Sequence, residues 1–93
     1  MLEPTATDLY YLDKLNTDPY QDSLTGKYND RNGLRVIVGK KYYGYTRGVF
    51  IAVFVGPYCS LVQKITSAKG VPVQKPKLTS VHNWWLRRID NDS

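Results

Sequence analysis

The stretch VIVGKKYYGYTRGVFIAV, residues 36–53, decides the fold. Two short apolar and β-branched runs, residues 36–38 and 49–53, flank a segment that holds three tyrosines, three cations and three glycines. Apolar runs of this kind, too short and too rich in valine for a helix, favour strands. The sequence therefore predicts two strands joined by a loop, and that loop concentrates aromatic surface and positive charge.

The strand pattern extends on both sides of this stretch. LRVIV (34–38) is the first predicted strand, VFIAVFV (49–55) is the second, and YCSLVQKI (58–65) follows it. VPVQKP (71–76) is predicted at a sheet edge, because its two prolines lack the amide proton of a central ladder. LTSVHNWWLRRI (78–89) closes the chain as a turn and a last strand. Several short strands with closely spaced turns predict a mainly β fold, a small barrel or sandwich.

The charges divide the chain into two parts. Residues 1–25 carry five carboxylates and one lysine, a formal charge of −4, whereas residues 26–93 carry twelve bases and three carboxylates, a charge of +9. We therefore predict an acidic N-terminal segment, residues 1–25, and one domain, residues 26–93. The segment forms a short helix, capped by Thr5 or Thr7, or is irregular, and it either docks on the domain or stays mobile.

Several classes of function are not expected. The lone cysteine, Cys59, fits a reducing compartment and a buried position, and no spacing resembles a metal site. No apolar run spans a bilayer, so an intracellular location, nucleus or cytoplasm, is expected without membrane association. His82 has no obvious nucleophile or carboxylate partner, and a phosphate-binding loop fails because Tyr45 replaces its lysine. We therefore expect no enzyme, no cofactor and no small-molecule substrate.

The same stretch resembles the KOW motif, in which a strand, a glycine-containing basic or aromatic loop and a second strand follow one another. Gly39 opens the loop, Gly44 lies in its middle and Gly48 begins the second strand. The downstream SLVQKITSAKGVPVQKPKL is similar to the hairpin that follows in such domains, so the resemblance covers about residues 33–81. It differs in that each interval between the glycines is longer by about one residue.

The resemblance implies an SH3-like barrel of about five short strands, as in NusG-related transcription elongation factors and KOW ribosomal proteins. Such domains bind RNA, DNA or protein and have no catalytic centre. By position, the resemblance assigns an exposed binding loop of six residues: Lys40, Lys41, Tyr42, Tyr43, Tyr45 and Arg47. Near the C-terminus, Trp85, Arg87 and Arg88 are a second candidate for recognition, or the tryptophan packs in the core.

Cations beside aromatic rings suit a single-stranded nucleic acid. Lysine and arginine bind phosphates, and tyrosine stacks on unpaired bases. We therefore predict a non-catalytic module that binds RNA or single-stranded DNA, linked to transcription or RNA. Three alternatives stay open. The tyrosines cover the core; the barrel binds a peptide or methyl-lysine through an aromatic groove; or the acidic segment docks on a basic face and competes with a polyanion.

Overall fold

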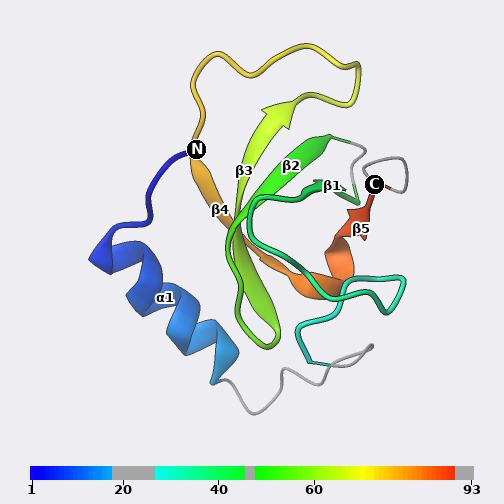
Figure 1. Cartoon of the computed structure of the whole chain (residues 1–93). Helices are drawn as coiled ribbons and strands as arrows, with labels where there is room; N and C mark the ends of the chain where they lie inside the picture. The colour runs from blue at the N-terminus through cyan, green and yellow to red at the C-terminus, as the bar shows by residue number, and fades with distance from the viewer. Residues whose placement is uncertain (18–26, 46–47, 90–93) are drawn as a thin grey trace.

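The computed structural model describes residues 1–17, 27–45 and 48–89. Within these ranges the chain forms an α-helix, five short strands and a 3₁₀ helix (Figure 1). In chain order, the elements are α1 (Ala6–Asn16), β1 (Lys41–Tyr43), β2 (Val49–Phe54), β3 (Cys59–Thr66), β4 (Leu78–His82), η1 (Asn83–Trp85) and β5 (Arg87–Arg88).

The five strands form one antiparallel sheet with the order β4-β3-β2-β1-β5. The first four strands are neighbours both in the chain and in the sheet. The 3₁₀ helix η1 then carries the chain from the edge strand β4 to the opposite edge, where β5 pairs with β1. The expected mainly β fold with a short N-terminal helix is confirmed, while closure into an SH3-like barrel stays a prediction.

The first strand does not lie where the sequence predicted it. Residues 34–38 are not a strand; β1 comes from Lys41–Tyr43, inside the predicted loop. Alternation explains this: Tyr42 is fully buried, whereas its neighbours on either side are exposed, as in a strand with one face on a core. The Tyr42 hydroxyl also accepts a hydrogen bond from the backbone N–H of Ile37, at 2.8 Å. The aromatic segment is therefore part strand and part turn.

The fourth predicted strand is also displaced. Residues 71–76 contribute only an isolated bridge between Pro72 and Thr66, and β4 begins at Leu78. Pro72 and Pro76 explain the shift, because neither can donate a ladder hydrogen bond. By contrast, β2 and β3 lie close to the predicted runs of residues 49–55 and 58–65.

The apolar side chains form two clusters, one on each face of β3. One cluster contains Val36, Tyr42, Phe50, Ala52, Val62 and Leu86. The other contains Leu12 of α1 with Cys59 and Leu61 of β3. Residues 59 and 61 therefore face α1 while residue 62 faces the main core, which is the two-residue alternation of a strand covered on both faces.

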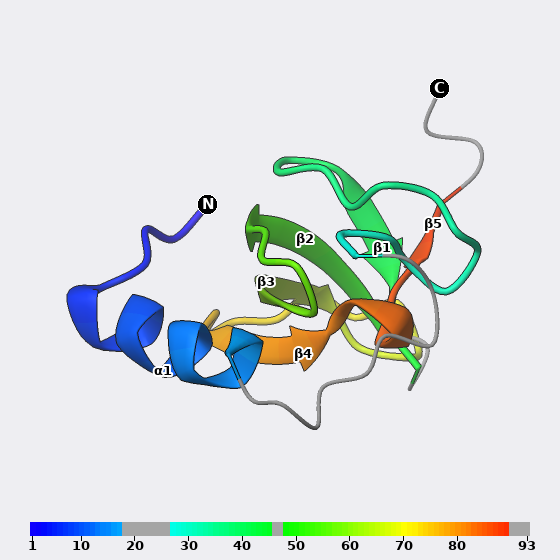
Figure 2. The same cartoon turned by 90° about the horizontal axis from the view of Figure 1, so that it is seen from below.

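Helix α1 docks on the sheet through its C-terminal half. Thr5 caps the helix, and its side chain and that of Asp8 bond reciprocally to backbone N–H groups at 3.1 and 2.9 Å. Leu12 is buried against β3. Figures 1 and 2 place α1 on one side of the molecule and β5 on the other. Residues 1–17 are therefore docked, and the rest of the predicted acidic segment lies outside the described residues.

Candidate nucleic-acid interface

A cavity of about 560 Å³ opens at the β5 side of the sheet, and we call it the arginine–tyrosine cleft. It is lined by Arg31, Tyr43, Gly44, Tyr45, Ala68 and Arg87. These residues come from four parts of the chain: the loop before β1, β1 with its turn, the β3–β4 loop, and β5. The cleft therefore exists only because the sheet order brings the last strand back beside the first.

One wall of the cleft is the pair Tyr43 and Arg87. The two residues face each other in the β1–β5 ladder, and the guanidinium carbon lies 5.3 Å from the ring centre. Tyr43 points outward because Tyr42 points into the core, and 37% of its surface is exposed. A guanidinium over a ring is attracted by the ring's quadrupole, which favours this geometry.

The other wall is the pair Tyr45 and Arg31. Tyr45 lies in the β1–β2 turn with 62% of its surface exposed, and the Arg31 guanidinium carbon lies 5.8 Å from its ring centre. The turn is closed by a hydrogen bond from Gly44 N–H to the Gly48 carbonyl, at 2.9 Å. A side chain at Gly44 would lie 2.5 Å from Trp85, so the turn rests directly on that indole.

A buried carboxylate places Arg31 in the cleft. Asp30 Oδ1 accepts hydrogen bonds from the backbone N–H groups of Asn32 and Leu34, both at 2.9 Å, and Oδ2 accepts one from Arg88 N–H at 3.1 Å. Arg31 N–H donates to the Leu86 carbonyl at 2.9 Å. These bonds fix the loop against β5. Sequence reasoning missed Arg31, although the turn-forming DRNG at residues 30–33 was a local signal.

The structure brings together three of the nine predicted binding residues: Tyr43, Tyr45 and Arg87 line the cleft. Lys41 is exposed on β1 and Lys40 is half-buried just before it, outside the lining of the cleft. Arg47 lies outside the described residues.

The remaining three predicted residues have structural roles. The expectation that Tyr42 exposes its ring is wrong, because the ring is completely buried in the main core. Trp85 is half-buried and packs edge-to-face on Phe50 at 5.0 Å, beneath the turn. Arg88 is half-buried, and its guanidinium donates a hydrogen bond to the Arg35 carbonyl. Tyr42 and Trp85 therefore support the cleft from the core, and Arg88 holds the loop beside it.

The sheet that forms the cleft is rich in positive charge. Residues 31–89 contain eleven lysines and arginines and no aspartate or glutamate, and this stretch contains the whole sheet. Asp30, just outside it, is buried and bonded to backbone N–H groups. A surface of this composition has a positive potential that attracts polyanions.

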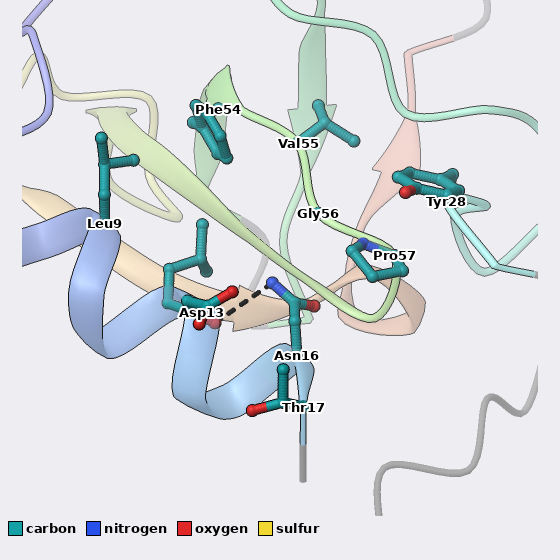
Figure 3. Close-up of a pocket in the computed structure, with 10 residues that line it drawn as sticks. Leu9, Asp13, Asn16, Thr17, Tyr28, Phe54, Val55, Gly56 and Pro57 are labelled. Atoms are coloured by element: carbon teal, nitrogen blue, oxygen red, sulfur yellow. Dashed lines mark hydrogen bonds between the residues drawn. The ribbon is translucent and has the colours of Figure 1, made fainter.

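A second cavity, of about 490 Å³, lies between α1 and the β2–β3 turn, and we call it the helix seam (Figure 3). Figure 3 shows Leu9, Asp13 and Asn16 on the helix side, facing Val55, Gly56 and Pro57. The Asn16 amide donates to the Leu12 and Cys59 carbonyls, both at 3.1 Å.

The Asn16 amide of the helix seam serves the fold. Asn16 Oδ1 accepts from the N–H groups of Tyr58 and Cys59, at 2.9 and 2.7 Å. A side chain at Gly56 would lie 2.3 Å from the Asn16 amide nitrogen, so helix and turn are in direct contact. Asn16 thus extends the hydrogen bonding of β3 into the helix, and its amide is already satisfied on both sides.

Cys59 and His82, for which no reactive role is expected, both occupy positions that serve the fold. Burial raises the pKa of the Cys59 thiol, which disfavours the reactive thiolate. His82 caps η1 by accepting a hydrogen bond from Trp84 N–H at its Nδ1, at 3.1 Å, and burial lowers its pKa. In the part of the chain that the structure describes, no three metal-binding side chains come together. Over the same residues, no helix has the length and apolarity needed to cross a bilayer.

Comparison of the chain with models of protein families, with curated proteins and with solved structures found no match.

Proposed function

We propose that this protein is a non-catalytic module that binds single-stranded RNA or DNA in the arginine–tyrosine cleft. The observation that carries the proposal is the convergence of two partly exposed tyrosines, each with a guanidinium over its ring. Three separate parts of the chain supply these groups.

The chemistry of the cleft suits an unpaired base and its phosphate. The free faces and edges of Tyr43 and Tyr45 offer stacking surface, which every base accepts through its own π face. Arg31 and Arg87 offer planar donors that bind phosphate oxygens in a bidentate manner. A duplex hides the faces of its bases, so rings in a concave site favour single strands.

The resemblance to KOW domains supplies the biological setting of the proposal. The five short antiparallel strands agree with the number that an SH3-like barrel implies. The lone buried thiol suits the reducing interior of a cell, where transcription and RNA processing occur. A role in transcription or RNA metabolism is therefore the setting that we propose.

Fluorescence anisotropy with labelled single-stranded oligonucleotides tests the proposal. Tyr45→Ala removes one stacking ring and is expected to weaken binding about tenfold or more. Arg87→Ala removes one cation and is expected to reduce the slope of log affinity against log salt by about 0.7, if it binds one phosphate. RNA and DNA of the same sequence, measured side by side, decide which of the two is preferred.

Helix α1 offers a matched control. Lys14 lies 4.8 Å from the ring centre of Tyr10, so this pair repeats the cation–ring geometry away from the cleft. Tyr10→Ala and Lys14→Ala are expected to leave both the affinity and the salt slope unchanged. Equal losses in the two pairs, or no loss at Tyr45 and Arg87, would contradict the assignment of the cleft.

An acidic peptide is the second candidate ligand. A methylated lysine would meet the positive guanidinium groups of Arg31 and Arg87, which already lie over the rings. The same groups favour carboxylates, so the protein-interaction alternative narrows to an acidic peptide. Titration with a glutamate-rich peptide separates the two: tighter binding than to an oligonucleotide of equal charge would replace the nucleic-acid proposal.

A further inference from the structure

The β3–β4 loop, residues 67–77, begins at the cleft and continues beyond it. Ala68 lines the cleft together with Tyr45, and the loop then arches over the end of the sheet towards β4 (Figure 1). Figure 2 shows the start of this loop beside the β1–β2 turn from a second direction. The loop is therefore the surface that a strand leaving the cleft on this side would meet.

Three lysines of the loop are exposed: Lys69, Lys75 and Lys77. The loop contains no aspartate or glutamate. Asp8 and Asp13 lie on α1, which docks on the far face of β3, whereas Glu3 follows Leu2, whose N–H donates to the Gln63 side chain of β3 at 2.7 Å. Within the loop the three lysines therefore repel one another, and a polyanion relieves this repulsion.

The loop is held in place by its own backbone. Ser67 N–H donates to the Val71 carbonyl at 2.9 Å, and Gly70 N–H donates to the Ser67 carbonyl at 3.0 Å. Ser67 Oγ accepts from the N–H groups of Lys69 and Val71, both at 3.2 Å. Val73 N–H then donates to the Ile65 carbonyl at 2.9 Å, which ties the return of the loop to β3.

Proline restrains the second half of the loop. Lys75 precedes Pro76 and Lys77 follows it, and the residue before a proline is confined to extended conformations. The two ammonium groups are therefore presented from a stiff stretch of chain, and little backbone entropy is lost when they bind.

We propose that the loop is a phosphate-binding extension of the cleft: a single strand held by its base in the cleft continues across residues 67–77, where Lys69, Lys75 and Lys77 bind its phosphates. This inference rests on the proposed function and deepens it. It assigns binding to three residues outside the cleft and predicts a footprint longer than the cleft itself.

Oligonucleotide length separates the loop from the cleft. A strand of about 4 nucleotides is expected to bind mainly through the cleft, whereas one of about 12 is long enough to cover the loop as well, within the range of known single-strand sites. The wild type is expected to bind the longer strand more tightly and with a steeper salt dependence. In the triple variant Lys69→Gln, Lys75→Gln, Lys77→Gln, the slope for the longer strand falls by about 2, since each phosphate contact contributes about 0.7.

The short strand and a helix lysine provide the controls. The triple variant is expected to bind the short strand within about twofold of the wild type, since the cleft is intact. Lys14→Gln replaces one exposed lysine on α1, outside the loop, and is expected to leave the slope unchanged. An unchanged unfolding midpoint in the triple variant shows that its losses arise from binding.

The possible results distinguish failure of the proposed function from failure of the loop inference. If no oligonucleotide binds the wild type, the proposed function is wrong and this inference falls with it. If both strands bind but the triple variant holds the longer one as tightly as the wild type does, the loop inference alone is wrong. If a glutamate-rich peptide of equal charge displaces the longer strand as well as RNA or DNA does, the loop binds acidic chains in general, which overturns its assignment to nucleic acid.

Discussion

The helix seam and the arginine–tyrosine cleft have similar volumes, about 490 and 560 Å³, but opposite chemistry. The helix seam is lined mostly by apolar side chains, and its one amide, Asn16, bonds backbone groups on the facing turn. In the cleft, Tyr45 and Arg87 are exposed; the Tyr45 ring contacts the Arg31 guanidinium, and the Arg87 guanidinium contacts the Tyr43 ring.

The difference shows that volume alone does not identify a site. An amide that already bonds the backbone, as that of Asn16 does, has little left to offer a ligand unless part of the fold opens. Within the described residues, the rings and guanidinium groups of the cleft contact each other, and such contacts are exchanged for a phosphate and a base at small cost. The comparison predicts that substitutions in the helix seam damage stability, whereas substitutions in the cleft damage binding.

The largest effect on stability is expected in the helix seam. Leu12→Ala removes a buried side chain that contacts Cys59 and Leu61, and such truncations cost about 3 kcal/mol. Leu15→Ala, at an exposed position of the same helix, is expected to cost about 0.5 kcal/mol or less. Urea unfolding measures both; equal costs would mean that α1 is not docked through Leu12.

The second effect links the fold to the cleft. Asp30→Asn keeps an acceptor for Asn32 and Leu34 but turns an amide N–H towards the backbone N–H of Arg88. An unpaired buried donor costs about 2 kcal/mol, and the loop that carries Arg31 loosens, so affinity for single strands should fall as well. Asn32→Ala retains the bonded backbone N–H and is the control. A stable Asp30→Asn variant with full affinity would show that this carboxylate does not position the loop.

A smaller effect is expected from pH through His82. Burial lowers the pKa of this side chain below its ordinary value of 6.5, so the unfolded chain binds the proton more readily than the folded protein does. Stability is therefore full above pH 6.5 and falls as the pH drops through the lower pKa of the folded state. Protonation also removes the Nδ1 acceptor of the Trp84 N–H.

Urea unfolding of the wild type and of His82→Asn between about pH 5 and 8 measures this dependence. Asparagine supplies a helix-capping oxygen that does not titrate in this range. The variant is expected to lose the part of the pH dependence that His82 causes, and identical pH profiles would assign that dependence to other groups.

The smallest effect on stability is expected in the cleft. Tyr45→Ala and Arg87→Ala remove exposed groups, so each is expected to change the free energy of unfolding by about 0.5 kcal/mol or less while reducing affinity. Thermal unfolding, followed alongside the anisotropy titrations, measures this separation. A loss of stability comparable to that of Leu12→Ala would mean that the cleft, like the helix seam, is part of the packing.

Local patterns predicted much of the fold. The apolar runs became β2 and β3, and Thr5 caps the helix as expected. The patterns failed where contacts between residues distant in sequence determine which residues form a strand. The β-branched residues 34–38 resemble a strand, yet the ladder uses Lys41–Tyr43, because Tyr42 fills the core between Phe50 and Leu86. A ring's burial depends on neighbours distant in sequence, which periodicity over three residues does not reveal.

The sequence predicted which kinds of residue form the candidate site, but it did not predict all of them. Tyr43, Tyr45 and Arg87 follow from the abundance of rings and cations in two short segments. Arg31 could not be assigned, since it reaches the cleft only through the bonds of Asp30 to its own loop and to β5. The same holds for the β3–β4 loop, whose place beside the β1–β2 turn depends on the pairing of β2 with β3.

Mapping of backbone amide shifts by NMR, as a single-stranded oligonucleotide is added to isotope-labelled protein, tests the central claim most directly. We predict that the largest shifts occur at Arg31, Gly44, Ala68 and Arg87. The amide signals of the helix seam are expected to stay unchanged. Shifts concentrated at Leu12, Asn16 and Gly56 with a silent cleft, or no shifts at all, would contradict the account.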